Sequence, residues 1–187
     1  MRNREIAGRL GRLLDRFFRD KGGVYEDAAR ACVRSLRAGG KILIFGNGGS
    51  AAEAQHFSAE LVNRFLKTRP AIPAVALSTD TSILTSIGND SGFDRIFSRQ
   101  VEALAESGNI ALALSTSGSS PNIINALKAA RKKKCVAIVL TGKGGGKLAS
   151  LSDFLLDVPS SETPRVQEVH LVLLHLLAEE IENSLSS

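Results

Sequence analysis

Hydrophobic residues along this chain follow two alternating patterns, and the alternation predicts the fold. Between short apolar runs, apolar positions recur every three or four residues, which is the spacing of amphipathic helices. Strands that alternate with helices are joined by crossovers, so they form a parallel sheet covered on both faces. We therefore predict an α/β fold, a three-layer sandwich in which helices flank a five-stranded parallel sheet and residues 1–187 form a single domain. The apolar runs assigned to strands are residues 42–45, 74–77, 110–114, 136–140 and 154–158.

The helical stretches begin before the first strand. Apolar residues repeat at helical spacing from Ile6 to Phe18 and from Val24 to Ala38, and the segment Asp20–Gly23 predicts a break between two helices. Because both helices precede the sheet, they cannot be crossovers, and we expect them to pack outside the sheet or against another subunit. Other helices are predicted from the first glycine turn to about residue 66, from Asp80 as the N-cap to residue 87, and over 94–105, 123–133 and 165–183, with a short one that ends at 151. Residues 88–92 are predicted to form a polar turn.

The amino-acid composition indicates a globular protein. Of the 187 residues, 43% are hydrophobic and 23% are charged, which is ordinary for a globular chain with a substantial core. The chain has no apolar run of about 18 residues, and charges interrupt its N-terminus, so we expect a cytosolic protein without a membrane span or signal peptide. Cys32 and Cys135 lack a CxxC spacing, and we interpret them as buried free thiols.

The net charge of +5 favours an anionic partner, either a phosphorylated metabolite or a nucleic acid. Much of the excess lies in Arg131–Lys134, at the end of a predicted helix, where cations complement the helix dipole. Aromatic residues make up 5% of the chain and Trp is absent, so platforms for base stacking are scarce. A metabolite is therefore favoured over a nucleic acid.

Two predicted turns have the chemistry of a binding site. Gly46–Ser50 leads from the first strand into a helix, and its backbone N–H groups suit an anionic or polyhydroxy ligand. Ser115–Ser120 follows the third strand and suits a phosphate monoester, although a serine-rich loop that caps its own helix is the alternative. Ligands of such folds bind outside the carboxyl ends of the strands, so the turns after strands one, three and four should line one mouth. The last turn, TGKGGGK, lacks the ending of a nucleotide-binding P-loop.

Two histidines fall on predicted helix faces with other polar residues. His56 and Glu60 are four residues apart, a spacing that places them on one face. Gln167 and His175 fall within about one quadrant of the last helix, with Leu171 between them. Taken alone, these positions indicate structural histidines, and His170 belongs to the same class.

Several motifs in order along the chain resemble the phosphoheptose isomerase family, within the sugar isomerase (SIS) domain group. They are GNGGSAAEAQHFSAEL, STDTSILTSIGND, ALSTSGSSPNII, VLTGKGGG and RVQEVHLVLLH. The resemblance implies a homotetramer with active sites between subunits, in which the N-terminal helices of residues 1–40 take part in packing. It implies isomerisation of sedoheptulose 7-phosphate to D-glycero-D-manno-heptose 7-phosphate through an enediol or enediolate, the first step of ADP-heptose synthesis for lipopolysaccharide or other surface glycans.

The resemblance also implies roles for residues. Glu60 and His175 match the catalytic base and acid, and zinc is the implied cofactor. A carboxylate that ligates zinc is less free to act as a base, so the two roles of Glu60 compete. The matched substrate-binding residues are Ser115, Thr116, Ser117 and Ser120 for the phosphate, and Asn47, Gly48, Gly49, Asn89, Asp90, Glu60 and Gln167 for the rest of the sugar; the matched zinc ligands are His56, Glu60, Gln167 and His175.

Two alternatives share the fold. The initiator-associating proteins, which bind the bacterial replication initiator without known isomerase activity, resemble the first half of the chain but lack the equivalents of Glu60 and His175. The third possibility is an isomerase or binding module for another sugar phosphate. The chain departs from many isomerases at Glu162-Thr163-Pro164, where Asp often precedes the equivalent of Arg165, and this puts the contacts of that loop in question.

Overall fold

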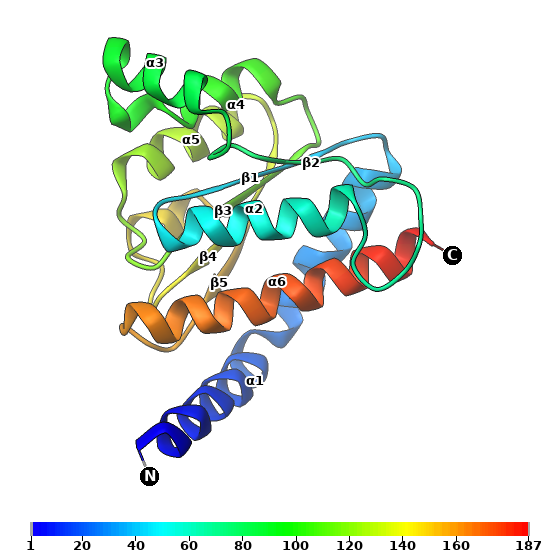
Figure 1. The fold of residues 1–187 in the computed structure, drawn as a ribbon, viewed down its shortest axis with the longest axis vertical. Coiled ribbons are helices and arrows are strands. Elements are labelled where there is room, and N and C mark those ends of the chain that lie inside the picture. Colours follow the sequence, from blue (N-terminus) through cyan, green and yellow to red (C-terminus); the bar gives the residue numbers. More distant parts are fainter. Residues whose placement is uncertain (1, 187) are drawn as a thin grey trace.

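A computed structural model describes residues 2–186. Its sheet has five parallel strands in the order β2-β1-β3-β4-β5, which confirms the predicted α/β sandwich (Figure 1). β1, β3 and β4 form the centre and are almost wholly buried, as expected for apolar strands covered on both faces. The strands are β1 (Ile42–Gly46), β2 (Ala74–Ala76), β3 (Ile110–Ser115), β4 (Val136–Thr141) and β5 (Phe154–Asp157).

Two helical layers cover the sheet. Alternate side chains of β1 show the division, because Ile42 and Ile44 pack under one layer while Leu43 and Phe45 pack under the other. The first layer holds α1 (Arg2–Arg37), α2 (Gly49–Val62) and α6 (Thr163–Leu185); the second holds α4 (Ser98–Leu104), α5 (Pro121–Lys132) and the short 3₁₀ helices η1 (Phe93–Arg95) and η2 (Gly146–Leu151). α2 and α6 run side by side in the same direction in front of the sheet (Figure 1).

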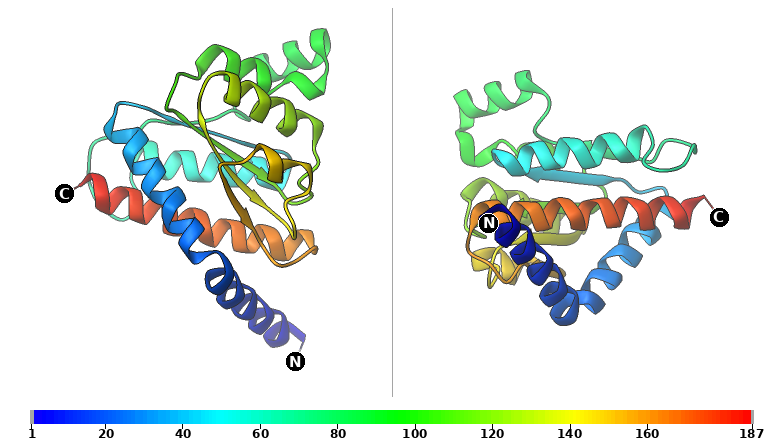
Figure 2. Two further views of the ribbon diagram at one scale, coloured as in Figure 1. Left: turned by 180° about the vertical axis from the view of Figure 1, so that it is seen from behind. Right: turned by 60° about the horizontal axis from the view of Figure 1, so that its bottom comes forward.

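The prediction of two N-terminal helices is wrong, because α1 is continuous through Gly22 and Gly23. Each glycine costs about 1 kcal/mol against Ala in a helix interior. Buried Phe17 and Tyr25 anchor the helix on either side of the pair, and Lys21 forms an ion pair with Asp157 at 2.7 Å. Tertiary contacts therefore hold a helix that its local sequence disfavours, and the helix changes direction part-way along its length (Figure 2, right panel).

Other predicted boundaries moved. α2 ends at Val62 rather than near residue 66, and the predicted helix over 94–105 divides into η1 and α4. α3 (Thr81–Ser91) begins as predicted, with the Asp80 carboxylate accepting from Ile83 N at 2.9 Å, but it continues through the segment predicted as a polar turn. None of the side chains of α3 is buried.

The expectations about the two cysteines and His170 are confirmed. Cys32 and Cys135 are free and buried. His170 is fully buried, its Nε2 lies 3.2 Å from the carbonyl oxygen of Thr141, and burial lowers its pKa to about 4. Among residues 2–186, no helix is long and apolar enough to cross a membrane.

Candidate active site

A cavity of about 240 Å³ lies outside the carboxyl ends of β1 and β3. The turns after these two strands meet there, as the sequence predicts. The turn after β4 does not line this cavity but supports it, because Gly142 N donates to the carbonyl of Thr116 at 3.1 Å. The lining residues are Asn47, Gly49, Ser50, Leu114, Ser115, Thr116, Ser117, Ser120, Thr163 and Gln167.

The serine-rich loop keeps several hydroxyls available to a ligand. Ser120 holds the N-cap position of α5, yet its side chain makes no capping hydrogen bond. Ser117 Oγ accepts from the hydroxyl of Ser119 at 3.2 Å, while the Ser115 hydroxyl oxygen accepts from Gly118 N at 3.2 Å. The helix-capping alternative therefore does not account for Ser120, and the loop presents hydroxyls and the N-terminus of a 12-residue helix to one small volume.

Close glycine packing fixes the shape of this loop. Gly118 has a φ of +63°, and a Cβ there would lie 2.3 Å from the carbonyl oxygen of Gly145. A Cβ on Gly146 would likewise lie 2.7 Å from the Gly118 carbonyl oxygen. The glycine-rich stretch after β4 thus serves close backbone approach to the loop after β3, not nucleotide binding.

Asn47 is held by a residue that sequence analysis missed. Its amide and that of Asn122 exchange two hydrogen bonds of 2.9 and 2.8 Å, which join the turn after β1 to the first turn of α5. Asn122 is almost fully buried. The sequence offered one signal for this contact, an Asn directly after Pro121 at the start of a predicted helix. Gly48, between Asn47 and Gly49, adopts a φ of +56° at the N-cap of α2 and does not itself line the cavity.

A cluster of titratable side chains lies further along α2 and α6. The Nε2 atoms of His56 and His175 are 2.8 Å apart, and Glu60 Oε1 lies 3.1 Å from the first and 3.5 Å from the second. These three residues could hold a metal ion. The other carboxylate oxygen of Glu60 is buried without a hydrogen-bond partner, and burial raises the pKa of Glu60 although both imidazoles lower it.

Gln167 lies at the cavity and not in this cluster. Its amide packs against Gly49, where a Cβ would meet Nε2 at 2.3 Å, and it makes no hydrogen bond to any of the three clustered residues. Eight residues separate it from His175, which is about 12 Å along the helix axis. The amide of Gln167 lies against Gly49 near the N-termini of α6 and α2, and the Nε2 atoms of His56 and His175 meet further along the same two helices. Figure 1 shows that α2 and α6 run side by side in the same direction.

Asn89 and Asp90 are not brought to the cavity. They are exposed near the end of α3, where Asn89 Nδ2 donates to Asp90 Oδ1 at 2.8 Å. In Figure 1, α3 lies beside α4 at the top of the view, whereas α6 lies toward the bottom. Within one chain these two residues are therefore separate from the site.

Glu53 is a second residue that sequence analysis missed. It lies on α2 between Ser50 and His56, is only 9% exposed, and has one carboxylate oxygen without a partner. Burial raises its pKa to about 7, against a smaller opposing effect of Ser50. Its spacing of seven residues from Glu60 places both carboxylates on one face of the helix.

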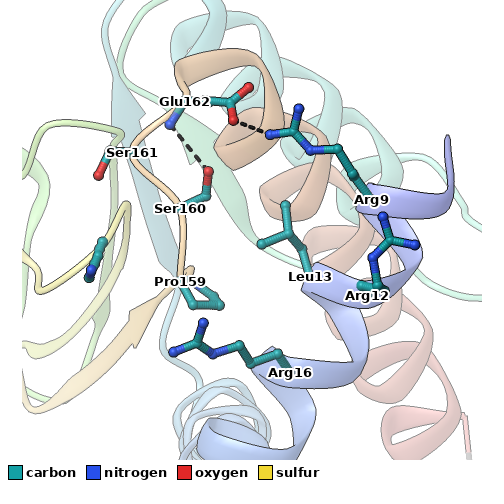
Figure 3. Close-up of a pocket in the computed structure, with 9 residues that line it drawn as sticks. Arg9, Arg12, Leu13, Arg16, Pro159, Ser160, Ser161 and Glu162 are labelled. Atoms are coloured by element: carbon teal, nitrogen blue, oxygen red, sulfur yellow. Dashed lines mark hydrogen bonds and ion pairs between the residues drawn. The ribbon is translucent and has the colours of Figure 1, made fainter. Parts of the chain in front are cut away.

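A larger cavity, of about 490 Å³, lies elsewhere, between α1 and the loop that precedes α6 (Figure 3). Arg9, Arg12, Arg16 and Lys143 make it basic, and Glu162 pairs with Arg9. It contains no histidine and no second carboxylate, so it lacks an acid–base pair. In the segment Glu162-Thr163-Pro164, which departs from many isomerases, Glu162 lines this larger cavity and Thr163 lines the smaller one.

Comparison with known proteins identifies the family. Residues 7–142 match the family model described as the SIS domain. The phosphoheptose isomerase of Aliarcobacter butzleri is 54% identical over 161 residues, which cover 86% of this chain and 85% of that protein. The chain belongs to the phosphoheptose isomerase family.

Solved structures of the phosphoheptose isomerase family have the same fold. The phosphoheptose isomerase of Neisseria gonorrhoeae superposes with a TM-score of 0.91 at 42% identity, covering 97% of each chain. The phosphoheptose isomerase of Francisella tularensis gives a TM-score of 0.90 at 34% identity, again over 97% of each chain. The predicted SIS fold and the resemblance are both confirmed.

Proposed function

We propose that this chain is an aldose–ketose isomerase that converts sedoheptulose 7-phosphate to D-glycero-D-manno-heptose 7-phosphate. Relatives named phosphoheptose isomerase, at up to 54% identity over most of the chain, support this function. The observation that carries the mechanism is that α2 and α6 together bear two sets of groups, a cavity lined by hydroxyls and N–H groups near their N-termini and an acid–base cluster further along. In this substrate the phosphate is on C7 and the reacting carbons are C1 and C2, so two separated sets of groups are what the reaction needs. The noncatalytic initiator-binding alternative is not favoured.

The phosphate binds in the loop after β3. Ser115, Thr116, Ser117 and Ser120 donate from hydroxyl and backbone groups to its oxygens, and the N-terminus of α5 adds favourable dipole charge. Asn47, Gly48 and Gly49 hold the sugar hydroxyls together with Gln167. Their placement at the neighbouring strand end orients the chain of the sugar from the serine-rich loop toward Glu60 and His175.

Glu60 is the base that carries the carbon-bound proton. It takes the proton from C1 of the ketose, which leaves an enediolate across C1 and C2, and returns it to C2. His175 supplies a proton to the oxygen on C2 and accepts the proton from the oxygen on C1, so atoms and charge balance over the cycle. Burial raises the pKa of Glu60, which makes its carboxylate a stronger base than an exposed one.

The residues fit a zinc ion. With bonds of about 2.0–2.1 Å and tetrahedral angles, zinc ligand atoms lie about 3.3 Å apart. The three atoms that converge here, Nε2 of His56, Nε2 of His175 and Oε1 of Glu60, are separated by 2.8, 3.1 and 3.5 Å, and Oε2 of Glu60 is buried without a hydrogen-bond partner. His56, Glu60 and His175 would hold the ion, and Gln167 would join after its side chain turns from Gly49. A bound zinc ion would polarise the carbonyl and stabilise negative charge on the enediolate.

We further propose a homotetramer in which neighbouring subunits complete each site. In this proposal Asn89 and Asp90 reach the substrate of another subunit, since they do not line the cavity of their own chain. The unburied α3 and the exposed Ile83 and Phe93, at 37% and 65% exposure, supply apolar surface for such contacts. In this proposal residues 1–187 form a single SIS domain, residues 1–40 also pack between subunits, and the reaction takes place in the cytoplasm.

The decisive experiment is direct turnover. Zinc-loaded protein is incubated with sedoheptulose 7-phosphate, and the aldose is followed by NMR, alongside Glu60→Gln and His175→Ala. We expect the aldose to form with the wild type and not with either variant, while a surface control, Glu102→Gln, keeps full activity. Chelation should abolish activity and Zn²⁺ should restore it. A wild type as inactive as its two variants would eliminate the proposal.

A further inference from the structure

The loop between α2 and β2, residues 63–73, is held by a carboxylate from the far end of α6. Glu182 is 1% exposed and accepts hydrogen bonds from the backbone N–H groups of Phe65, Leu66 and Lys67 at 3.1, 2.8 and 2.9 Å. Burial alone would raise the pKa of Glu182, but these three donors and Arg69 lower it below its ordinary value. An ionised side chain therefore organises a loop that has no regular secondary structure of its own.

Arg69 joins the same carboxylate to the end of α2. Its side chain is 3% exposed, and Nε donates to Glu182 Oε1 at 3.0 Å. The other nitrogens donate to the backbone carbonyls of Glu60 and Leu61 at 2.8 and 2.7 Å. One planar guanidinium thus binds α6 and the last turn of α2, at the residue that carries the proposed base.

The loop also contacts the proposed acid. The ring of Phe65 stacks on the imidazole of His175, with centroids 5.8 Å apart and planes at 14°. Phe65 N is one of the groups that Glu182 binds, so the position of this ring follows from the ion pair. Arg69 and Glu182 consequently restrain Glu60 on one side and His175 on the other, without touching the cavity.

We propose that Arg69 and Glu182 are positioning residues, which hold Glu60 and His175 at reacting distance through the 63–73 loop. A buried ion pair is often replaceable by apolar residues without loss of stability. What apolar side chains cannot supply is the set of directed hydrogen bonds to three N–H groups and two carbonyls. This role rests on the proposed function for its catalytic consequence, but the positioning itself can be measured without turnover.

The test uses Arg69→Lys. An ammonium group is a point charge and cannot bind the Glu182 carboxylate and both backbone carbonyls at once, as the planar guanidinium does. We expect kcat to fall by about 10–100-fold, as for groups that orient a catalytic residue, with KM nearly unchanged. Phe65→Leu leaves the ion pair intact and should lower kcat in the same direction. Phe65→Tyr keeps the ring and should restore nearly full turnover.

Imidazole NMR signals supply the readout that does not depend on turnover. The ring current of Phe65 contributes to the chemical shifts of the His175 ring protons, and we expect this contribution to shrink in Arg69→Lys and vanish in Phe65→Leu. The buried His170 lies on α6 with His175, and its ring contacts the carbonyl of Thr141 in β4; its signals are the internal reference and should not move. Val101→Ala, in the core on the opposite face of the sheet, is the matched control for destabilisation and should leave His175 and kcat unchanged.

The outcomes separate this inference from the proposed function. If the His175 signals of both Arg69→Lys and Phe65→Leu match those of the wild type, the positioning role is overturned. A loss of kcat that Val101→Ala reproduces at equal thermal stability would overturn it as well, since that would be a general effect of destabilisation. If the wild type turns over no substrate, the proposed function fails while the chemical shifts still decide the positioning role.

Discussion

The proposed phosphate end and the proposed reacting end of the site are built in different ways. At the phosphate end, turns after β1 and β3 present backbone N–H groups and short hydroxyls, and close contacts between glycines fix their shape. At the reacting end, long side chains of His56, Glu60 and His175 project from the middle of helices and meet within 3.5 Å. The first end is rigid because backbones touch, whereas the second depends on contacts behind each side chain.

This difference suits the chemistry expected at each end. A phosphate changes little during isomerisation, so a fixed cradle of donors serves it throughout. The acid–base groups must exchange protons in both directions, so their positions must be held while their charges change. We therefore expect substitutions at the phosphate end to affect stability and substrate binding, and substitutions at the reacting end to affect kcat.

The largest effect is expected from a side chain added where the loop after β3 contacts the glycine-rich turn after β4. Gly118→Ala would place a Cβ 2.3 Å from the Gly145 carbonyl oxygen in a backbone conformation with positive φ. We expect the free energy of unfolding to fall by about 2–4 kcal/mol, and KM to rise as the loop is displaced. Chemical denaturation measures the first quantity. Gly108→Ala, also at positive φ but with open space around it, is the control and should cost less; equal losses would refute the close-packing argument.

The next effect concerns the buried Glu53. Its pKa is about 7 in the folded protein against an ordinary 4.5, so the folded state retains a proton that the unfolded state loses. Below about pH 4.5 Glu53 is protonated in both states, and its contribution to stability is at its highest. As the pH rises toward 7, the free energy of unfolding should fall by up to about 3 kcal/mol. Glu53→Gln should remove this part of the pH dependence in denaturation curves at pH 4.5–8; an identical profile for the variant would contradict the burial of an uncompensated carboxyl.

The reacting end is tested by moving its base without removing the charge. Glu60→Asp retracts the carboxylate by one methylene, and a displacement of about 1 Å costs roughly 100-fold in rate, or about 2.7 kcal/mol. We expect kcat to fall by this factor with KM little changed, measured by steady-state kinetics. A rise in KM with kcat intact would place Glu60 in substrate binding instead of proton transfer.

The smallest effect is expected from a single hydroxyl at the phosphate end. Ser120→Ala removes one donor to a charged group, worth about 1.5–3 kcal/mol, and weakens substrate binding by roughly 10–100-fold with kcat retained. Ser152→Ala, a serine that does not line either cavity described above, provides the comparison. Equal KM values for the two variants would show that Ser120 does not hold the phosphate.

Local sequence predicted the central strands well because β1, β3 and β4 are apolar runs buried on both faces of the sheet. It failed at Gly22–Gly23, where the local signal for a break is opposed by packing of Phe17 and Tyr25 that only the folded chain provides. It failed again at residues 88–92, where Asn89 and Asp90 continue α3. In both cases the helix extends beyond the point at which local preferences would end it.

The candidate site divides in the same manner. The turns after β1 and β3 were predictable because the carboxyl ends of parallel strands must share one edge of the sheet. Spacing placed His56 and Glu60 on one face, but only the resemblance joined them to His175, 115 residues beyond Glu60. The ion pair of Arg69 with Glu182 had no signal at all, since neither residue has a motif and their contact is created by the fold.

The parallel course of α2 and α6 also sets the spacing between the two ends of the site. Seven residues on α2 and eight on α6 separate the Gly49–Gln167 contact from the contact of the two histidines, so the cavity and the acid–base cluster keep a fixed separation along the helices. A sugar whose phosphate is bound at the serine-rich loop therefore reaches Glu60 only if its carbon chain has the matching length. A shorter phosphosugar would bind at the serine-rich loop yet leave its carbonyl short of Glu60, so selectivity for chain length would appear in kcat and not in affinity.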